Sequence, residues 1–493
     1  MSAREREPAP GATEQATEQA TEHATTRAGG GDAAGSGGAA RDLAARLDRL
    51  PVVTRTHRLW AGLLGALFVF DLVDLNSFAY AAPALRSQWG ISIGEVGVVT
   101  SAGFAGMFLG AIVGGRLSDH FGRRPVLIGA VFFYSTFSLA TAAAWDTWSL
   151  AVLRVLTGFG LQAMTGVLLV FVSEMFPRAL RGRYQAMLLA IGLAGVPIAA
   201  WIARLVVPLG PGSWRWIFVA GALGVVVAVI ALRVLPESVR WQVANGRDTQ
   251  ASERLVARLE DEAAARAGGP LPAPEPVAPT PRGRVRDLLT GRDLRRLVVT
   301  SAAMVFLILS FYGFSSWVPT LLVERGYTTA ESLTVSSILS IAAVPGALLA
   351  MPIIDRVERK TLLFAIQCAV AVLLAVFGLS TGSVGIVVAG FLAAMLMQTG
   401  VAVLYTYAAE VFPLHLRGLG SGIANGTGRL AGIVGALVVA AIFTGAGFVA
   451  VFAYLAGAAL LMGLVLLLFG ERTSNRRLED IAGSSVAPKT SDV

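Results

Sequence analysis

The sequence is poor in the residues that build most catalytic and metal sites. It has one cysteine and four histidines in 493 residues. Cys368 falls inside an apolar run, which excludes disulfides and cysteine metal clusters. The histidines (His23, His57, His120 and His415) lie outside the predicted membrane interiors, which argues against a histidine proton relay there. No nucleophile–base pair, metal cluster or cofactor loop is recognisable, so we expect no enzyme, no cofactor and no metal.

Charge is also scarce, and apolar residues dominate. Only 15% of residues are charged while 55% are hydrophobic, more apolar surface than a soluble chain of this size could cover. The apolar residues gather in twelve runs of about 20 residues, the length that crosses a bilayer core of about 30 Å. We therefore predict an all-α membrane protein with twelve transmembrane helices. The runs are 59–82, 94–117, 125–145, 148–172, 184–207, 215–235, 297–322, 332–354, 361–380, 383–408, 418–441 and 446–469.

Three polar segments separate and flank these runs. Both ends of the chain hold few large apolar side chains, so we predict disordered tails, and the first lacks the pattern of a signal peptide. The longest loop should form short surface helices around Thr249–Arg266 and a flexible Pro-rich stretch after Gly268. The predicted domains are a tail (1–56), a six-helix bundle (57–235), a linker (236–296), a second six-helix bundle (297–470) and a tail (471–493).

One loop pattern occurs twice, 236 residues apart. An acid and two basic residues recur in the same spacing, and so does an acid followed by Phe-Pro and Arg-Gly. Duplicated halves are a recurrent transporter architecture, with the substrate path between them. We predict that these loops form ion pairs that control opening, the alternative being a simple orientation signal. The residues assigned to this role are Gly115, Asp119, Gly122, Arg123, Arg124, Glu174, Arg181, Asp355, Arg356, Arg359, Lys360, Glu410 and Arg417.

The basic residues of the short loops also predict orientation. They concentrate on the side of the membrane that holds these repeated loops, whereas the other side holds few. Positively charged loops stay in the cytoplasm. We therefore place the repeated loops, the linker and both termini there.

Four ionisable residues lie inside predicted spans, where charge is costly and marks functional positions. Asp71 and Asp74 share a helix face, and close carboxylates in a low dielectric resist joint ionisation, which suits proton coupling. Arg154 lies at a depth similar to that of Asp74 and could pair with one acid, leaving the other to titrate. The alternative is a permanent structural cluster.

Arg429 is the fourth, near the midplane of its span, where transporters hold substrate. A guanidinium there can bind a carboxylate with two parallel hydrogen bonds, so we expect an organic anion. The alternative is a pair with an acid or carbonyl of another helix. Polar residues that could complete a binding site, or simply pack between helices, are Gln162, Tyr312, Gln398, Tyr405 and Asn425.

At these residues the chain resembles the major facilitator superfamily. Gly115–Arg124 is similar to its signature between helices 2 and 3, and Arg154 with Gly158 and Gly160 to its helix 4 motif. The segments Asp71–Asp74 and Trp317–Leu322 resemble elements of its aromatic-acid/proton and related metabolite symporters. Pro236–Trp241 resembles an element that the aromatic-acid/proton symporters share with sugar porters and organic-ion transporters. The resemblance implies two pseudo-symmetric six-helix bundles, alternating access and proton-driven uptake, with Asp71, Asp74 and Arg429 in the site.

Our leading hypothesis is a proton-coupled symporter for a small organic acid, such as an aromatic carboxylate. Its partners would be the substrate, protons and lipid, not nucleic acid. We expect it to work as a monomer in the inner membrane. The alternatives are a drug or metabolite exporter, a sugar or polyol symporter, and a non-transporting membrane sensor.

Overall fold

The computed structural model describes residues 42–274, 284–413 and 415–473. The predicted tails 1–41 and 474–493, and part of the Pro-rich stretch, lie outside the described residues. These described parts form two compact units. The smaller comprises 42–57, 173–181 and 237–274, and the larger holds the apolar helices.

The larger unit is built from helices, and no strand occurs among the described residues. Within the described ranges, eleven helices are long and apolar enough to cross a membrane. The last of them has 53 residues, which at 1.5 Å per residue is about 80 Å, more than twice a bilayer core of about 30 Å. Gly447 interrupts it with a φ of 81°. It therefore contains two spans, and the predicted total of twelve follows.

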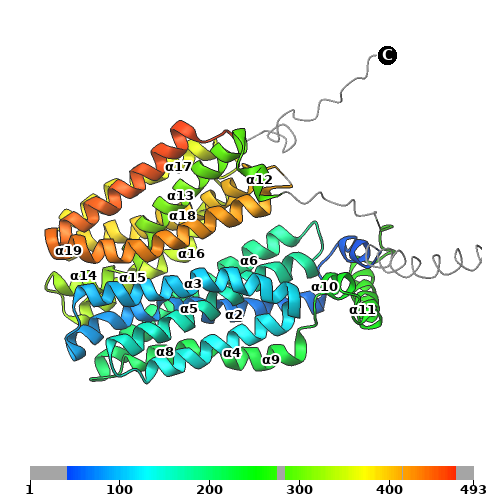
Figure 1. The fold of residues 1–493 in the computed structure, drawn as a ribbon, viewed down its shortest axis with the longest axis horizontal. Helices are drawn as coiled ribbons and strands as arrows, with labels where there is room; N and C mark the ends of the chain where they lie inside the picture. Colours follow the sequence, from blue (N-terminus) through cyan, green and yellow to red (C-terminus); the bar gives the residue numbers. More distant parts are fainter. Residues whose placement is uncertain (1–41, 275–283, 414, 474–493) are drawn as a thin grey trace, which may run out of the picture. The chain divides into compact units, whose positions relative to one another are not determined.

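The helices of the first half form one layer and those of the second half the other (Figure 1). A short turn, η1 (Val207–Leu209), follows α7, and α12 (Val285–Leu288) precedes the second half. The first half consists of α2 (Arg55–Trp89), α3 (Ile93–Phe121), α4 (Arg123–Ala142), α5 (Thr147–Met175), α6 (Arg181–Leu193), α7 (Gly195–Val206), α8 (Arg215–Ala222) and α9 (Gly224–Val234). The second consists of α13 (Gly291–Ser315), α14 (Val318–Glu324), α15 (Thr329–Ile341), α16 (Ala343–Ala350), α17 (Arg359–Leu379), α18 (Ser383–Glu410) and α19 (Arg417–Phe469).

Proline explains three of the interrupted spans. Proline has no N–H for the carbonyl four residues earlier, and its ring clashes with that carbonyl. Pro197, Pro319 and Pro345 each lie four residues after the last residue of the preceding helix, namely α6, α13 and α15. The breaks therefore fall where the sequence removes a helical hydrogen bond. The break between α13 and α14 places Ser316 in a non-helical turn.

Helices α3 and α5 touch through glycine. A Cβ atom added at Gly110 would lie 2.1 Å from the carbonyl oxygen of Phe159, and one added at Gly114 would lie 2.7 Å from Cα of Ala163. At the neighbouring Gly115, by contrast, an added Cβ would meet nothing within 4 Å. The contact occurs one residue earlier, because only that face of α3 is turned toward α5.

Substituting these glycines should have opposite outcomes. Gly110→Ala forces a methyl group against a backbone carbonyl, and overpacking of this kind costs about 1–3 kcal/mol. We expect a lower midpoint of thermal unfolding and less monodisperse protein in detergent. Gly115→Ala is the matched control and should behave as the unsubstituted protein. Equal stability of the two variants would contradict the packing described here.

The two halves contact each other near one end of their spans. We call the end flanked by Arg123, Arg359 and Arg417 the basic end, and the other the opposite end. Toward the opposite end, Arg86 pairs with Glu324 at 2.5 Å. Two hydroxyls and one guanidinium also bond across the halves there: Ser101 to the carbonyl of Ile433 (2.6 Å), Ser337 to the carbonyl of Ala200 (3.0 Å), and Arg204 to Thr334.

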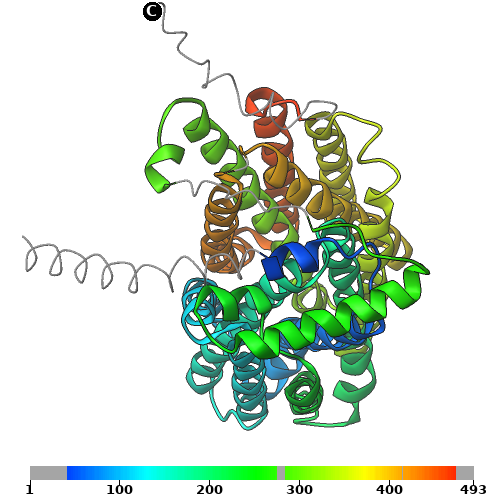
Figure 2. The ribbon, with the colours of Figure 1, turned by 90° about the vertical axis from the view of Figure 1, so that its right-hand side faces the viewer.

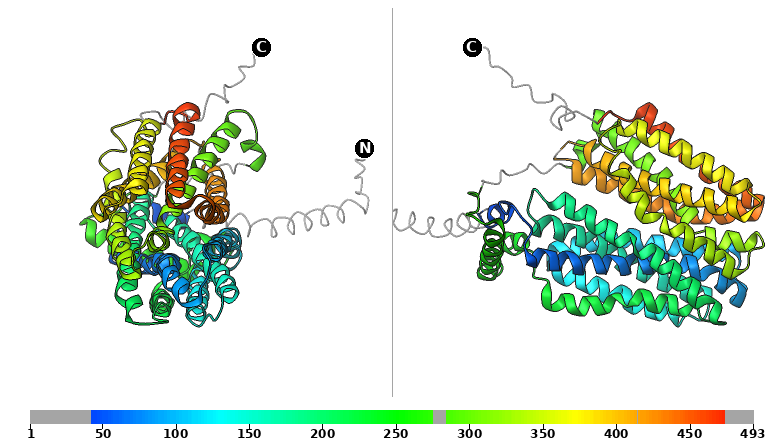
Figure 3. Two further views of the ribbon diagram at one scale, coloured as in Figure 1. Left: turned by 90° about the vertical axis from the view of Figure 1, so that its left-hand side faces the viewer. Right: turned by 180° about the vertical axis from the view of Figure 1, so that it is seen from behind.

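The arrangement of the two helix layers agrees with contacts between the halves at the opposite end. In Figures 1 and 3 the two halves run close together beside α14 and α15, and their axes diverge toward α12. The halves are thus joined at the opposite end.

The described part of the smaller unit contains three helices: a short helix at 42–48, α10 (Val239–Ala244) and α11 (Thr249–Ala267) (Figure 2). Our prediction of disorder up to residue 56 is wrong for 42–56. Leu43, Leu47 and Leu50 are buried, and both oxygens of Glu260 bind arginines, Arg46 and Arg49, at 2.7 Å. These partners lie more than 200 residues away along the chain, so the segment alone does not reveal its order.

Carboxylates tie the smaller unit together. Burial opposes the ionisation of Glu262, but bonds from the hydroxyl and backbone N–H of Thr56 lower its pKa to about 2. Because the folded pKa lies below the ordinary 4.5, this contribution to stability is present above pH 4.5 and is lost as pH falls toward 2. Asp48 accepts bonds from Arg181 and Arg240. The smaller unit thus fastens the segment before α2 to the loop after α5 and to the linker.

A candidate binding cavity between the two halves

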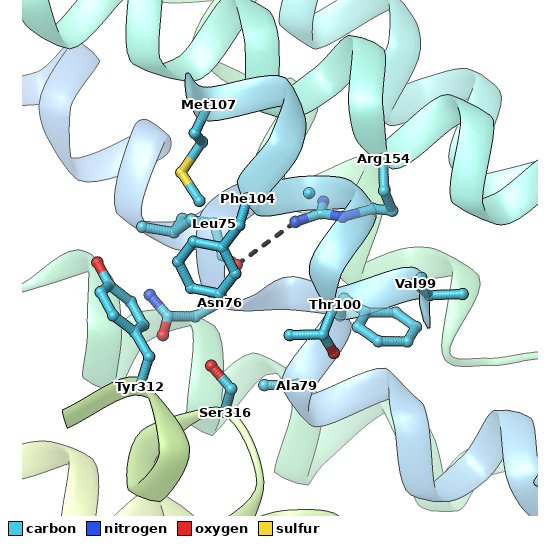
Figure 4. A pocket seen from close by; sticks show the side chains of 12 residues that line it. Leu75, Asn76, Ala79, Val99, Thr100, Phe104, Met107, Arg154, Tyr312 and Ser316 are labelled. Atoms are coloured by element: carbon cyan, nitrogen blue, oxygen red, sulfur yellow. Dashed lines mark hydrogen bonds between the residues drawn. The ribbon is translucent and has the colours of Figure 1, made fainter. Parts of the chain in front are cut away.

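A polar cavity lies between the first and second halves of the larger unit (Figure 4). The space between its walls is about 430 Å³, a volume that includes the part open to solvent. The first half contributes most of its wall, and the second half contributes Tyr312 and Ser316 beside the break between α13 and α14. The full lining is Leu75, Asn76, Phe78, Ala79, Val99, Thr100, Gly103, Phe104, Met107, Arg154, Tyr312 and Ser316.

Asp74 and Arg154 form a buried ion pair at the wall. Their nearest charged atoms are 3.4 Å apart, and 0% of Asp74 and 4% of Arg154 is exposed. The hydroxyl of Ser138 also donates to Asp74, and Gly221 leaves the space for this carboxylate. Arg154 donates further bonds to the carbonyls of Asp74 and Leu75. Asp74 therefore has a cationic partner and a hydroxyl donor, and it anchors Arg154 at the wall of the cavity.

Asp71 has a different environment, although it lies on the same helix. One carboxylate oxygen accepts a bond from the hydroxyl of Thr165 at 3.1 Å. The other, Oδ1, is buried without a hydrogen-bond partner among the described residues. Arg429 from α19 is near enough to interact electrostatically with Asp71. A carboxylate with one unsatisfied oxygen in a dry site is suited to hold a proton.

Arg429 stands at the edge of the cavity. Its guanidinium lies 3.9 Å from the sulfur of Met107, which lines the cavity, and interacts with the hydroxyls of Tyr312 and Tyr405. Tyr405 in turn interacts with Asn425. Nε of Arg429 is buried without a hydrogen-bond partner in the described part of the chain. The guanidinium therefore has donor capacity left for a ligand.

The structure brings together most of the polar residues predicted for the site. Arg154 and Tyr312 line the cavity, while Asp71, Asp74, Arg429, Tyr405 and Asn425 surround it through the contacts above. Two predicted residues lie elsewhere. Gln398 is buried on α18 against Gly346, and Gln162 is half-buried on α5. Neither belongs to the lining of this cavity, so the structure gives no support for assigning them to substrate.

Sequence reasoning missed three polar residues of the lining: Asn76, Thr100 and Ser316. Hydroxyl side chains inside helices commonly bond to their own backbone, so a serine or threonine carries little signal in a sequence. Asn76 was the one that could have been noticed. It lies five residues after Asp71, and a carboxamide is uncommon in an apolar span.

The repeated loops form ion pairs and hydrogen bonds within each half. Asp119 pairs with Arg123 at 3.0 Å, and Asp355 pairs with Arg359 at 3.4 Å. Arg359 also lies 2.8 Å from Glu410 at the end of α18. Further contacts of the predicted loop residues include Arg123 with the carbonyl of Ser118, Arg124 with the carbonyl of Leu232, Lys360 with the carbonyls of Leu467 and Gly470, and Glu174 with Ser238.

Twelve spans in two halves, with a polar cavity between them, define a membrane transporter. Residues 59–483 match the family described as "Sugar (and other) transporter". The chain belongs to this family, within the major facilitator superfamily, and is a multi-pass membrane protein rather than an enzyme.

Similar proteins cover nearly the whole chain. YyaJ of Bacillus subtilis (strain 168), whose name assigns it to metabolite transport, is 39% identical over 88% of this chain and 96% of its own length. The niacin transporter NiaP of Acinetobacter baylyi is 31% identical over 89% and 99%. The 3-(3-hydroxy-phenyl)propionate transporter of Escherichia coli (strain K12) is 29% identical over 84% and 94%. A solved D-xylose–proton symporter shares the fold, with a TM-score of 0.66, 19% identity and coverage of 85% and 99%.

Proposed function

We propose that this protein is a proton-coupled symporter that takes up small aromatic carboxylates by alternating access. One observation carries the proposal. A buried carboxylate with an unsatisfied oxygen, Asp71, lies within electrostatic reach of an arginine with free donor capacity, Arg429, at the edge of a cavity lined by both halves.

Arg429 is the proposed anchor for the substrate carboxylate. Charge-assisted pairs of arginine and carboxylate are strong and bind in a defined geometry. The surroundings of Arg429 suit a ring, because Phe104 and Tyr312 meet edge to face at 4.9 Å and Met107 adds a polarisable wall. Two relatives are named as transporters of niacin and of 3-(3-hydroxy-phenyl)propionate. Both compounds are aromatic carboxylates, which supports this class.

Asp71 is the proposed proton site. The Asp74 carboxylate is committed to Arg154 and Ser138, so it serves to hold Arg154 and the cavity wall in place. Asp71 has fewer partners and faces Arg429, so protonation of Asp71 changes the charge that Arg429 presents to an anion. Proton binding and substrate binding would be coupled through this one arginine.

The proposed transport cycle uses the two ends in turn. We place the basic end, the linker and both termini in the cytoplasm of the inner membrane, as the basic loops indicate. The structure is then closed toward the outside by the cross-half bonds near Arg86 and Ser337. The loop pairs around Asp119 and Asp355 would hold the cytoplasmic ends of each half during opening and closing, and one chain would suffice for transport.

Uptake by purified protein in proteoliposomes tests the proposal. The labelled compounds are benzoate, nicotinate, 3-(3-hydroxyphenyl)propionate, succinate and D-xylose, each with and without an inward proton gradient. We expect gradient-dependent accumulation of the aromatic carboxylates. Accumulation of xylose alone would remove Arg429 as the anchor, and gradient-driven efflux would reverse the direction. Absence of flux for every compound would contradict the proposed substrate class.

A further inference from the structure

The cavity has a second polar end, away from Arg429. Along α13 and the turn after it, Ser316 lies four residues beyond Tyr312, about 6 Å further toward the opposite end. Along α3, Thr100 lies seven residues from Met107, about 10 Å in the same direction. Figure 4 shows Asn76, Thr100 and Ser316 grouped below Phe104, with Met107 at the other end.

Existing bonds decide which hydrogen-bonding atoms this second end can offer. The amide nitrogen of Asn76 donates to the carbonyl of Leu72 at 2.7 Å. A carbonyl can only accept, so this bond fixes the orientation of the carboxamide. It uses one of the two amide N–H groups and leaves the oxygen as an acceptor on the cavity wall. The hydroxyl of Thr100 donates to the carbonyl of Val96 at 2.8 Å, which uses its only hydrogen and leaves its lone pairs.

From this geometry we infer that Asn76 and Thr100 determine specificity by requiring a hydrogen-bond donor on the substrate, at the end of the ring away from its carboxylate. The inference rests on the proposed function, because Arg429 must hold the carboxylate. Ser316 adds a hydroxyl that can adapt to either polarity. A single ring with a carboxylate at one end and a hydroxyl at the other would direct its two polar groups toward these two ends of the cavity.

This requirement separates substituents of almost equal size. A phenolic hydroxyl donates a hydrogen bond to the Asn76 oxygen, whereas a methoxy group at the same position can only accept. An ether oxygen against the Asn76 oxygen leaves this carboxamide oxygen without a donor, and an unmade bond at a buried acceptor is costly. A hydroxyl beside the carboxylate, as in 2-hydroxybenzoate, does not reach the second end.

Equilibrium competition on the full chain in lipid nanodiscs tests the inference. The compounds are 4-hydroxybenzoate, 4-methoxybenzoate, 2-hydroxybenzoate and benzoate. For the unsubstituted protein we expect 4-hydroxybenzoate to bind at least about 10-fold more tightly than 4-methoxybenzoate, the effect of one good hydrogen bond. Asn76→Leu should reduce this ratio to within about twofold, and Thr100→Val should reduce it by about threefold.

Ser77→Ala is the matched control. Ser77 is the next residue on α2, and its hydroxyl bonds to Val73 rather than lining the cavity, so the ratio should be unchanged. If the unsubstituted protein binds all four aromatic carboxylates without preference, or if Asn76→Leu and Thr100→Val both keep the preference, the inference is overturned and the proposed function stands. If none of the four binds, the proposed function itself fails.

Discussion

Arg429→Ala abolishes the binding of aromatic carboxylates, while the protein still folds and inserts. The variant removes the guanidinium that lies beside Met107 and Tyr312 at the edge of the cavity. Loss of one partner from a buried charge pair costs about 2–5 kcal/mol, so the dissociation constant should rise by about 100-fold or more. Folding should survive because Asp71, the charge left behind, can take up a proton. Isothermal titration with benzoate on purified protein measures the change.

Two further variants show whether charge or geometry matters at this position. Arg429→Lys keeps the positive charge but loses the planar pair of donors, so binding should be intermediate. Arg233→Gln removes a charge from an exposed position on α9 and should leave affinity unchanged. Unaltered benzoate affinity in Arg429→Ala would remove this residue from the substrate site.

The second large effect is expected at Asp71. Asp71→Asn keeps the shape and the bond with Thr165 but cannot exchange a proton. In proteoliposomes, accumulation driven by an inward proton gradient should disappear, whereas exchange of labelled for unlabelled substrate should continue. Asp146→Asn, an exposed acid in a loop, is the control and should keep both activities.

The neighbouring acid should respond differently. Asp74→Asn leaves Arg154 buried without a charged partner, and breaking a buried pair costs about 3–5 kcal/mol. We therefore expect less folded protein rather than a folded but uncoupled transporter.

Full gradient-driven accumulation by Asp71→Asn would refute the assignment of the proton site to Asp71.

The sequence predicted which residues lie inside the membrane spans better than it predicted which way their side chains face. Runs of apolar residues and the repeat identified the spans, and the rarity of charge in them selected Asp71, Asp74, Arg154 and Arg429. Which way a residue faces depends on the packing of helices far apart in the chain. Gln398, for example, has a polar side chain inside a span, as a site residue would, but it is buried against Gly346.

Contacts distant in sequence explain the remaining differences. The helix at 42–48 is held by Glu260, and no local pattern announces that partner. Thr100 became visible as a site residue only once α3 and α13 were placed on either side of one cavity. The helix preferences of the residues and their hydrophobic pattern are therefore sufficient to predict the spans. The residues that line the binding cavity can be identified only once the two halves are assembled.

The serine bonds at the opposite end have a consequence for turnover. Ser101 donates to the carbonyl of Ile433, and Ser337 shares its one hydrogen between the carbonyl of Leu333 in its own helix and that of Ala200. Both cross-half acceptors are backbone carbonyls, so the bonds form whatever side chain the partner residue carries. Hydrogen bonds between helices in a membrane average about 0.6 kcal/mol each, so the pair biases the balance of closed and open populations by only about tenfold. In the proposed cycle, a bias of this size is small enough for a bound ligand to reverse. The strength of these bonds would also affect the rate at which the protein without substrate changes between its closed and open states.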